Sequence, residues 1–265
     1  MLARLPAIAL WLSLALLLWF AVAVFGPKFG LIDWKVGLGT MVMGWGAILT
    51  GVALLVALIA LIAVLWRGPR GQWWKAALAL AIPAAIFAGL MSVRAQGESV
   101  PPIHDVATDT ADPPMFSDRV IAMRGPEANP LNDYSTPLGK LEMWRERLAD
   151  DPMGRQSHAA IIGESFGNLR SIAYTGDQAS AAMAVKAAME DIGLTEVVVT
   201  SDGTRVEGVA ETFAFGFKDD VVARIRDGRI DLRSVSRVGV SDLGYNAERI
   251  RELSAAIEER LRTNQ

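Results

Sequence analysis

The sequence predicts an α+β fold in which three amino-terminal transmembrane helices precede a soluble domain with a four-stranded antiparallel sheet and flanking helices. Long uncharged stretches predict the first part, and short β-branched runs separated by Gly-containing turns predict the second. Charge divides the chain at the same place, because residues 1–96 hold seven basic residues and one acidic residue whereas the remainder holds 19 basic and 28 acidic residues. We therefore expect a membrane domain at 1–96, a proline-rich linker or strap at 97–137 and a soluble α+β domain at 138–265.

Three stretches without a charged residue, 7–25, 36–66 and 76–93, are long enough to cross a hydrocarbon core of roughly 30 Å. A signal peptide is the alternative for the first stretch, since Arg4 precedes it, but the apolar region of a signal peptide has only about 7 to 15 residues. No ionisable residue lies inside a stretch, so we do not expect a pump or transporter. The sequence predicts a multi-pass protein with the lipid bilayer as its first partner.

The loops between these stretches predict the orientation. The second loop, 67–75, holds three basic residues and no acid, whereas the first loop combines Lys28 and Lys35 with Asp33. Cytoplasmic loops are enriched in Lys and Arg, which favours the second loop as the cytoplasmic one. We therefore expect an inner (cytoplasmic) membrane protein with a periplasmic carboxyl-terminal domain. The absence of cysteine is compatible with either compartment.

Small residues four positions apart recur in the second stretch and allow close helix approach in lipid. They can pack against the other two helices of this chain or against a foreign membrane protein. The pairs are Thr40 and Gly44, Gly46 and Thr50, and Ala47 and Gly51.

The soluble domain is expected to fold alone from about Asp133, because it contains two hairpins and capped helices. The strap before it has many prolines, and its apolar side chains can be buried along the domain. These side chains are Ile103, Val106, Met115 and Phe116. The predicted helices are 140–149, 178–192 and 246–261. Asp177 or Thr175 is expected to cap the second helix, and Asn246 the third. These helices are expected to cover one face of a sheet formed by strands 195–201, 205–217, 221–226 and 230–237.

One run, from Arg233 to Asn246, concentrates arginine, serine, aspartate and glycine between a strand and a helix. It resembles the RS-x-SR-x-G-x-SD-x-G-x-N signature of the bacterial membrane-associated family called domain of unknown function 1499. The segment PPIHDVATD at 101–109 is similar to a motif of family members that have such a membrane portion. The resemblance covers about the last two-fifths of the chain and implies family membership without a particular substrate.

Two interpretations of this signature remain. Arginine forks, hydroxyl groups and the free N–H groups of a helix start are the elements of an anion site. Alternatively, Asp242 pairs with Arg233 or Arg237 and the segment joins strand to helix as a structural polar network. Under either interpretation the candidate residues are Arg233, Ser234, Ser236, Arg237, Asp242 and Asn246.

The sequence offers few other chemical groups, so we expect neither a metal nor a cofactor. With no cysteine, and with His104 and His158 far apart, it has no zinc spacing. Asp219 and Asp220 form either a cation-ligand pair or a solvated turn, and the latter is expected. His104 beside Asp105 as a base, and Ser234 or Ser236 as a nucleophile without a G-x-S-x-G elbow, are weaker hypotheses.

The acidic balance of the soluble domain disfavours nucleic acid as a partner. The scarcity of catalytic groups favours a membrane-anchored, noncatalytic periplasmic module that binds or stabilises another cell-envelope component, such as a membrane protein. The alternative is an enzyme or receptor for an anionic envelope molecule that uses the segment Arg233 to Asn246.

Overall fold

The computed structural model describes residues 4–66, 68 and 70–263. The chain folds as two compact units, which are described separately. The first comprises Met1–Gln96 together with Thr212–Gly216, and the second comprises Gly97–Glu211 together with Phe217–Gln265.

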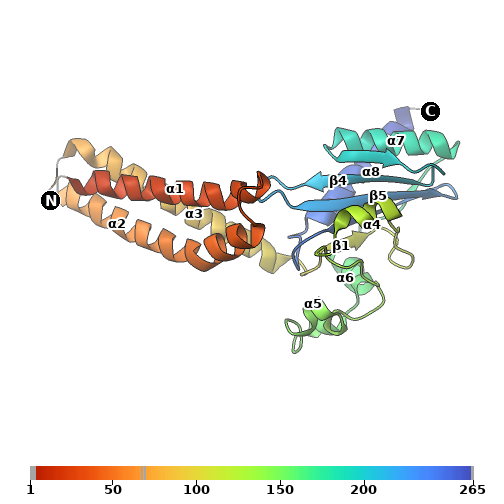
Figure 1. Ribbon diagram of the computed structural model, residues 1–265, viewed down its shortest axis with the longest axis horizontal. Helices are drawn as coiled ribbons and strands as arrows, with labels where there is room; N and C mark the ends of the chain where they lie inside the picture. Colours follow the sequence, from red (N-terminus) through yellow and green to blue (C-terminus); the bar gives the residue numbers. More distant parts are fainter. Residues whose placement is uncertain (1–3, 67, 69, 264–265) are drawn as a thin grey trace. The chain divides into compact units, whose positions relative to one another are not determined.

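Long apolar helices form most of the first unit (Figure 1). They are α1 (Leu5–Lys28), the π-helix η2 (Lys35–Gly46), which continues into α2 (Ala47–Trp66), and α3 (Trp73–Ser99), which follows a 3₁₀ turn at Arg70–Gln72. Among the described residues, three helical segments are long and apolar enough to cross a membrane, in agreement with the three predicted spans. This is the organisation of a multi-pass membrane protein.

The small residues of η2 and α2 divide into an inner and an outer set. A Cβ on Gly37 would lie 2.4 Å from the carbonyl oxygen of Ala23, and one on Gly46 would lie 3.0 Å from the Phe20 ring, so these glycines permit contact with α1. Thr50 is buried as well. The outer set is exposed and consists of Thr40, Gly44, Ala47 and Gly51.

An antiparallel sheet of six strands forms the centre of the second unit. The strands are β1 (Asp105–Ala107), β2 (Ile172–Ala173), β3 (Thr195–Val199), β4 (Arg205–Glu211), β5 (Lys218–Arg226) and β6 (Arg229–Ser236), in the order β1-β6-β5-β4-β3, with β2 also paired to β6. The four predicted strands are present. The sheet gains β1 and β2, which are too short to show a period of two in the sequence.

Helices flank this sheet in the order α4 (Asp118–Arg124), α5 (Glu142–Arg145), α6 (His158–Ser165), α7 (Gln178–Asp191) and α8 (Tyr245–Thr263), with 3₁₀ turns at Leu138–Lys140 and Pro152–Arg155. The predicted cap of α7 is confirmed, because the Asp177 side chain accepts a hydrogen bond from Ser180 N. The predicted helix 140–149 is only partly helical. Leu141 has extended angles (φ −83°, ψ 136°) and separates the 3₁₀ turn from α5.

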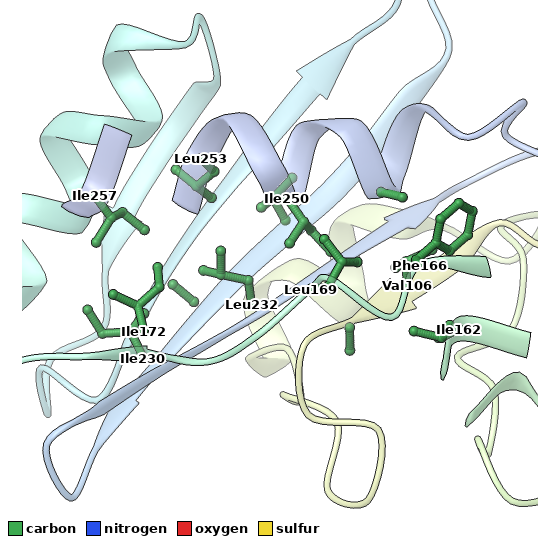
Figure 2. Close-up of a cluster of buried hydrophobic side chains, with 14 of the residues drawn as sticks. Val106, Ile162, Phe166, Leu169, Ile172, Ile230, Leu232, Ile250, Leu253 and Ile257 are labelled. Atoms are coloured by element: carbon green, nitrogen blue, oxygen red, sulfur yellow. The ribbon is translucent and has the colours of Figure 1, made fainter. Parts of the chain in front are cut away.

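The larger core lies between the sheet and helices α7 and α8. Figure 2 shows Ile250, Leu253 and Ile257 of α8 directed toward Leu232 and Ile230 of β6. Three turns of α8 therefore contribute a continuous apolar stripe.

A second, smaller core lies on the opposite face of the sheet, where α4 packs (Figure 1). There Phe116 and Val120 contact Val222 of β5 and Val235 of β6. The prediction that helices cover one face is therefore wrong, because side chains on both faces of β5 are buried. Within the strap, Ile103, Val106 and Phe116 are buried, whereas Met115 is 53% exposed.

Candidate functional site: the polar network around strand β6

Alternation along β6 divides the signature between the two faces of the sheet. Arg233 and Arg237 contact groups on the face that carries the strap and α4. Ser234 and Ser236 contact α8 on the other face. The predicted site residues therefore do not converge on one point.

Arg233 forms a buried ion pair with Asp105 of β1. Its Nε donates to Asp105 Oδ1 at 2.9 Å and its Nη2 donates to Oδ2 at 2.7 Å, and both side chains are at most 1% exposed. Tyr134 adds its hydroxyl group to the same carboxylate at 2.6 Å, and the guanidinium lies 5.1 Å from the Tyr134 ring centre. Burial raises the pKa of Asp105, but the adjacent Arg233 and these hydrogen bonds outweigh burial and hold it below its ordinary value. This pair holds β1, the edge strand that the strap contributes, against β6.

Arg237 shares the carboxylate of Asp220 with Arg124. Arg237 Nη2 lies 2.6 Å from Asp220 Oδ1, and Arg124 Nη1 lies 2.6 Å from Oδ2. Arg124 also donates to the carbonyl oxygen of Asn129 at 2.7 Å. The prediction of a solvated turn at Asp219 and Asp220 is wrong, because two arginines neutralise a fully buried Asp220.

Asn246 joins β6 to the first turn of α8. Its Oδ1 accepts from Ser234 Oγ at 2.6 Å, and its Nδ2 donates to Ser236 Oγ at 3.0 Å and to the His104 carbonyl at 2.9 Å. Arg249 of α8 donates to Asn246 Oδ1 at 2.7 Å and pairs with Asp219 at 2.8 Å. Each of the two hydroxyl groups is thus hydrogen bonded inside the fold.

Asp242 has a different role from the predicted one. It accepts from the backbone N–H groups of Gly244 and Asn246, both at 2.8 Å, and so caps the start of α8. The predicted pairing of Asp242 with Arg233 or Arg237 is wrong, because Asp105 and Asp220 occupy those guanidinium groups. Asn246, predicted as the cap, lies inside the helix instead. Burial raises the pKa of Asp242 to about 6 despite the two N–H donors.

Two histidines, His104 and His158, pack against Trp144 in the core. The His104 ring stacks on Trp144 with centroids 5.2 Å apart, and the His158 ring meets it edge-on at the same separation. Neither ring nitrogen of His158 has a hydrogen-bond partner in the described part of the chain. Burial lowers the pKa of both histidines, that of His158 to about 4, so both are neutral at neutral pH. The His104 side chain is fully buried, so it is not accessible to solvent and cannot act as a base on a substrate at the surface.

The comparisons with known proteins identify one family. The family described as "Protein of unknown function (DUF1499)" matches residues 105–257. The chain belongs to the DUF1499 family. Neither the curated proteins nor the solved structures include a match to it.

The DUF1499 match begins at Asp105 and ends in α8, so the domain includes the strap as well as the compact sheet. The residues that hold these parts together were missed in part by sequence reasoning. Arg124 and Arg249 carry no local signal, and Asp105 was predicted only as part of the segment 101–109 and as the neighbour of His104, not as an ion-pair partner. The charged partners of these residues, Asp220, Asp219 and Arg233, are distant in sequence, so no spacing rule connects the ion pairs.

The geometry of this DUF1499 domain favours structural roles for the signature side chains. A hollow beside α8 is lined by Leu194, Tyr245, Glu248 and Arg249, among others, and includes none of Arg233, Ser234, Ser236 and Arg237. Across residues 4–66, 68 and 70–263, no group of three or more His, Asp or Glu side chains is placed to hold a metal ion.

Proposed function

We propose that this DUF1499 protein is a membrane-anchored, noncatalytic periplasmic module that binds or stabilises another component of the bacterial cell envelope. One observation carries the proposal: the signature side chains are used inside the fold. Arg233 is paired with Asp105, Arg237 with Asp220, and the two serines with Asn246. Such saturated networks fix a structure and leave recognition to other surfaces.

The outer set of small residues on η2 and α2 supports binding within the membrane. Thr40, Gly44, Ala47 and Gly51 are exposed, and apart from the neighbouring backbone of its own helix no described atom lies within 4 Å of a Cβ built on Gly51. Surfaces of this kind let a second helix approach closely in lipid. A transmembrane segment of an envelope protein is the partner that fits this surface.

The loop charges support the periplasmic side. Arg70 lies in the 3₁₀ turn between α2 and α3 and Lys75 lies in the first turn of α3, while Arg67 lies outside the described residues. Alkaline phosphatase fused after Gln265 should be active, and a reporter that works only in the cytoplasm should be silent there. Activity of the cytoplasmic reporter alone would place the DUF1499 domain on the other side.

A matched pair of glycine variants tests the partner. Gly51 in α2 and Gly89 in α3 are both exposed, with no described atom within 4 Å of a built Cβ apart from the neighbouring backbone of the same helix. After crosslinking in native membranes, we expect a discrete envelope protein to co-purify with the parent and with Gly89→Leu but not with Gly51→Leu. Failure of any envelope component to co-purify with the parent would contradict the proposal.

The alternative function, binding an anionic envelope molecule, draws on Arg237, whose side chain is 14% exposed. Asp220 already accepts two hydrogen bonds from Arg237 Nε and one from its Nη2. An anion would have to compete with this buried carboxylate.

A further inference from the structure

Five residues of the loop between β4 and β5, Thr212–Gly216, belong to the same unit as the membrane helices. Phe215 N donates to the carbonyl oxygen of Val24 at 3.0 Å, and Lys28 Nζ donates to the carbonyl oxygen of Thr212 at 3.2 Å. The Phe213 ring meets the Phe25 ring edge-on with centroids 5.4 Å apart. The loop therefore contacts the last turn of α1 through both backbone and side chains.

Backbone conformation makes this contact close. Gly216 has φ +64°, and a Cβ added there would lie 2.9 Å from Cα of Lys28. Phe215 also has a positive φ, 63°. A left-handed conformation costs about 1–3 kcal/mol for a residue other than glycine. The surrounding contacts with the end of α1 must therefore hold Phe215 in this conformation.

The position of this contact along α1 corresponds to the membrane boundary. At a rise of about 1.5 Å per residue, Val24 lies roughly 30 Å along the helix from Leu5, which is the thickness of a hydrocarbon core. Lys28 follows within the next turn, and its amine lies 5.8 Å from the Phe213 ring centre. A lysine whose stem lies on apolar groups while its amine reaches the headgroups is typical of this boundary.

Large apolar side chains at this level are uncovered. Phe213 is 78% exposed, and Phe29 and Leu31, which follow α1, are 70% and 75% exposed. Aromatic side chains of this kind are stable where acyl chains meet headgroups. Because the loop is continuous with a membrane span, lipid is the occupant that covers Phe213.

We propose that the loop Thr212–Gly216 is an interfacial membrane contact, in which Phe213 enters the boundary between headgroups and acyl chains beside the carboxyl end of α1. Two segments form this membrane contact, and the first is the carboxyl end of α1. The second, the loop Thr212–Gly216, begins 184 positions after Lys28 in the sequence.

Site-directed spin labelling tests this proposal in the intact protein, since the chain has no cysteine. Phe213→Cys is labelled with a nitroxide in vesicles of phosphatidylcholine and phosphatidylglycerol, and its collisions with oxygen and with a water-soluble nickel chelate are compared. We expect oxygen to be several-fold favoured over the chelate at this position. Ala214→Cys keeps Phe213 and should give the same preference.

Two further single cysteines calibrate the measurement. Met183 of α7 and Leu55 of α2 are each 59% exposed apolar residues, so Met183→Cys provides the water reference and Leu55→Cys the deep lipid reference. Values for Phe213→Cys and Ala214→Cys between these references support the proposal. If both loop labels are as accessible to the chelate as the Met183→Cys label, the proposal is overturned.

Discussion

Arg233 of β6 and Asp105 of β1 are 128 positions apart in the sequence and form a two-bond ion pair that is almost completely buried. The register places Asp105 opposite Val235, so the pair crosses between adjacent antiparallel strands. The strap therefore contributes both a strand and a buried counter-charge to the DUF1499 domain.

Removing Asp105 should leave the Arg233 guanidinium unpaired in the interior. We expect Asp105→Ala and Arg233→Ala each to lower the free energy of unfolding by about 3–5 kcal/mol. The double variant should lose much less than the sum of the two, because the residues are energetically coupled. Chemical denaturation monitored by circular dichroism gives the free energy of unfolding of the parent, the two single variants and the double variant. Additive losses would show that the two residues are not coupled.

Truncation within the strap should abolish folding, contrary to the expectation from sequence. A chain that begins at Asp133 lacks Asp105 and also Phe116, which belongs to the second core. We expect it to lack a cooperative melting transition, whereas a chain that begins at Gly97 should melt cooperatively. Equal melting of the two truncated chains would show that β1 is dispensable.

At about pH 4 or below, where Asp242 is protonated in the folded state, Asp242→Ala should cost only about 0.5–2 kcal/mol, the range for a lost helix cap, because no arginine depends on Asp242. Asp242→Asn should instead raise the free energy of unfolding at high pH. The pKa of Asp242 is raised from 3.8 to about 6, so the folded state binds the proton more tightly and the parent loses stability as pH rises between these values.

The Asn variant, which carries no ionisable group at this position, should therefore be more stable than the parent by up to about 3 kcal/mol above pH 6. The two should converge as pH falls toward about 4. Denaturation of both proteins over this pH range provides the comparison, and a difference that does not change with pH would exclude titration of Asp242.

His158→Phe should stabilise the domain, because phenylalanine retains the ring contacts with Tyr134 and Trp144 and removes two unpartnered ring nitrogens. Leaving a buried polar group unsatisfied costs about 1–3 kcal/mol. The pKa of His158 is lowered from 6.5 to about 4, so the parent loses stability as pH falls through this window. The advantage of the variant should grow on acidification, and a constant advantage from neutral pH to about pH 4 would contradict the assignment.

Elements with strong local signals were predictable from the sequence. The uncharged spans and the Ala-rich helix α7 with its Asp177 cap depend on neighbouring residues alone. The short strand β1, the pairing of Arg233 with Asp105 and the burial of Asp220 depend on contacts between distant segments. The error at Asp242 has the same origin, because Arg233 and Arg237, which precede it closely in the sequence, were assigned to it. The partner of Arg233 lies 128 positions away, and the partner of Arg237 lies on the neighbouring strand β5.

We propose that the signature from Arg233 to Asn246 forms the interior of the DUF1499 domain and does not bind an anion. Thermal melting of the purified full-length protein in chloride and in phosphate at equal ionic strength tests it most directly. We predict that phosphate, which stabilises folded proteins non-specifically, raises the melting temperature of the parent and of Arg237→Ala equally, and that Arg233→Ala melts at a much lower temperature than the parent in both salts. A phosphate-dependent increase in the parent, lost in an Arg237→Ala variant that melts normally in chloride, would contradict the claim and make Arg237 a ligand contact.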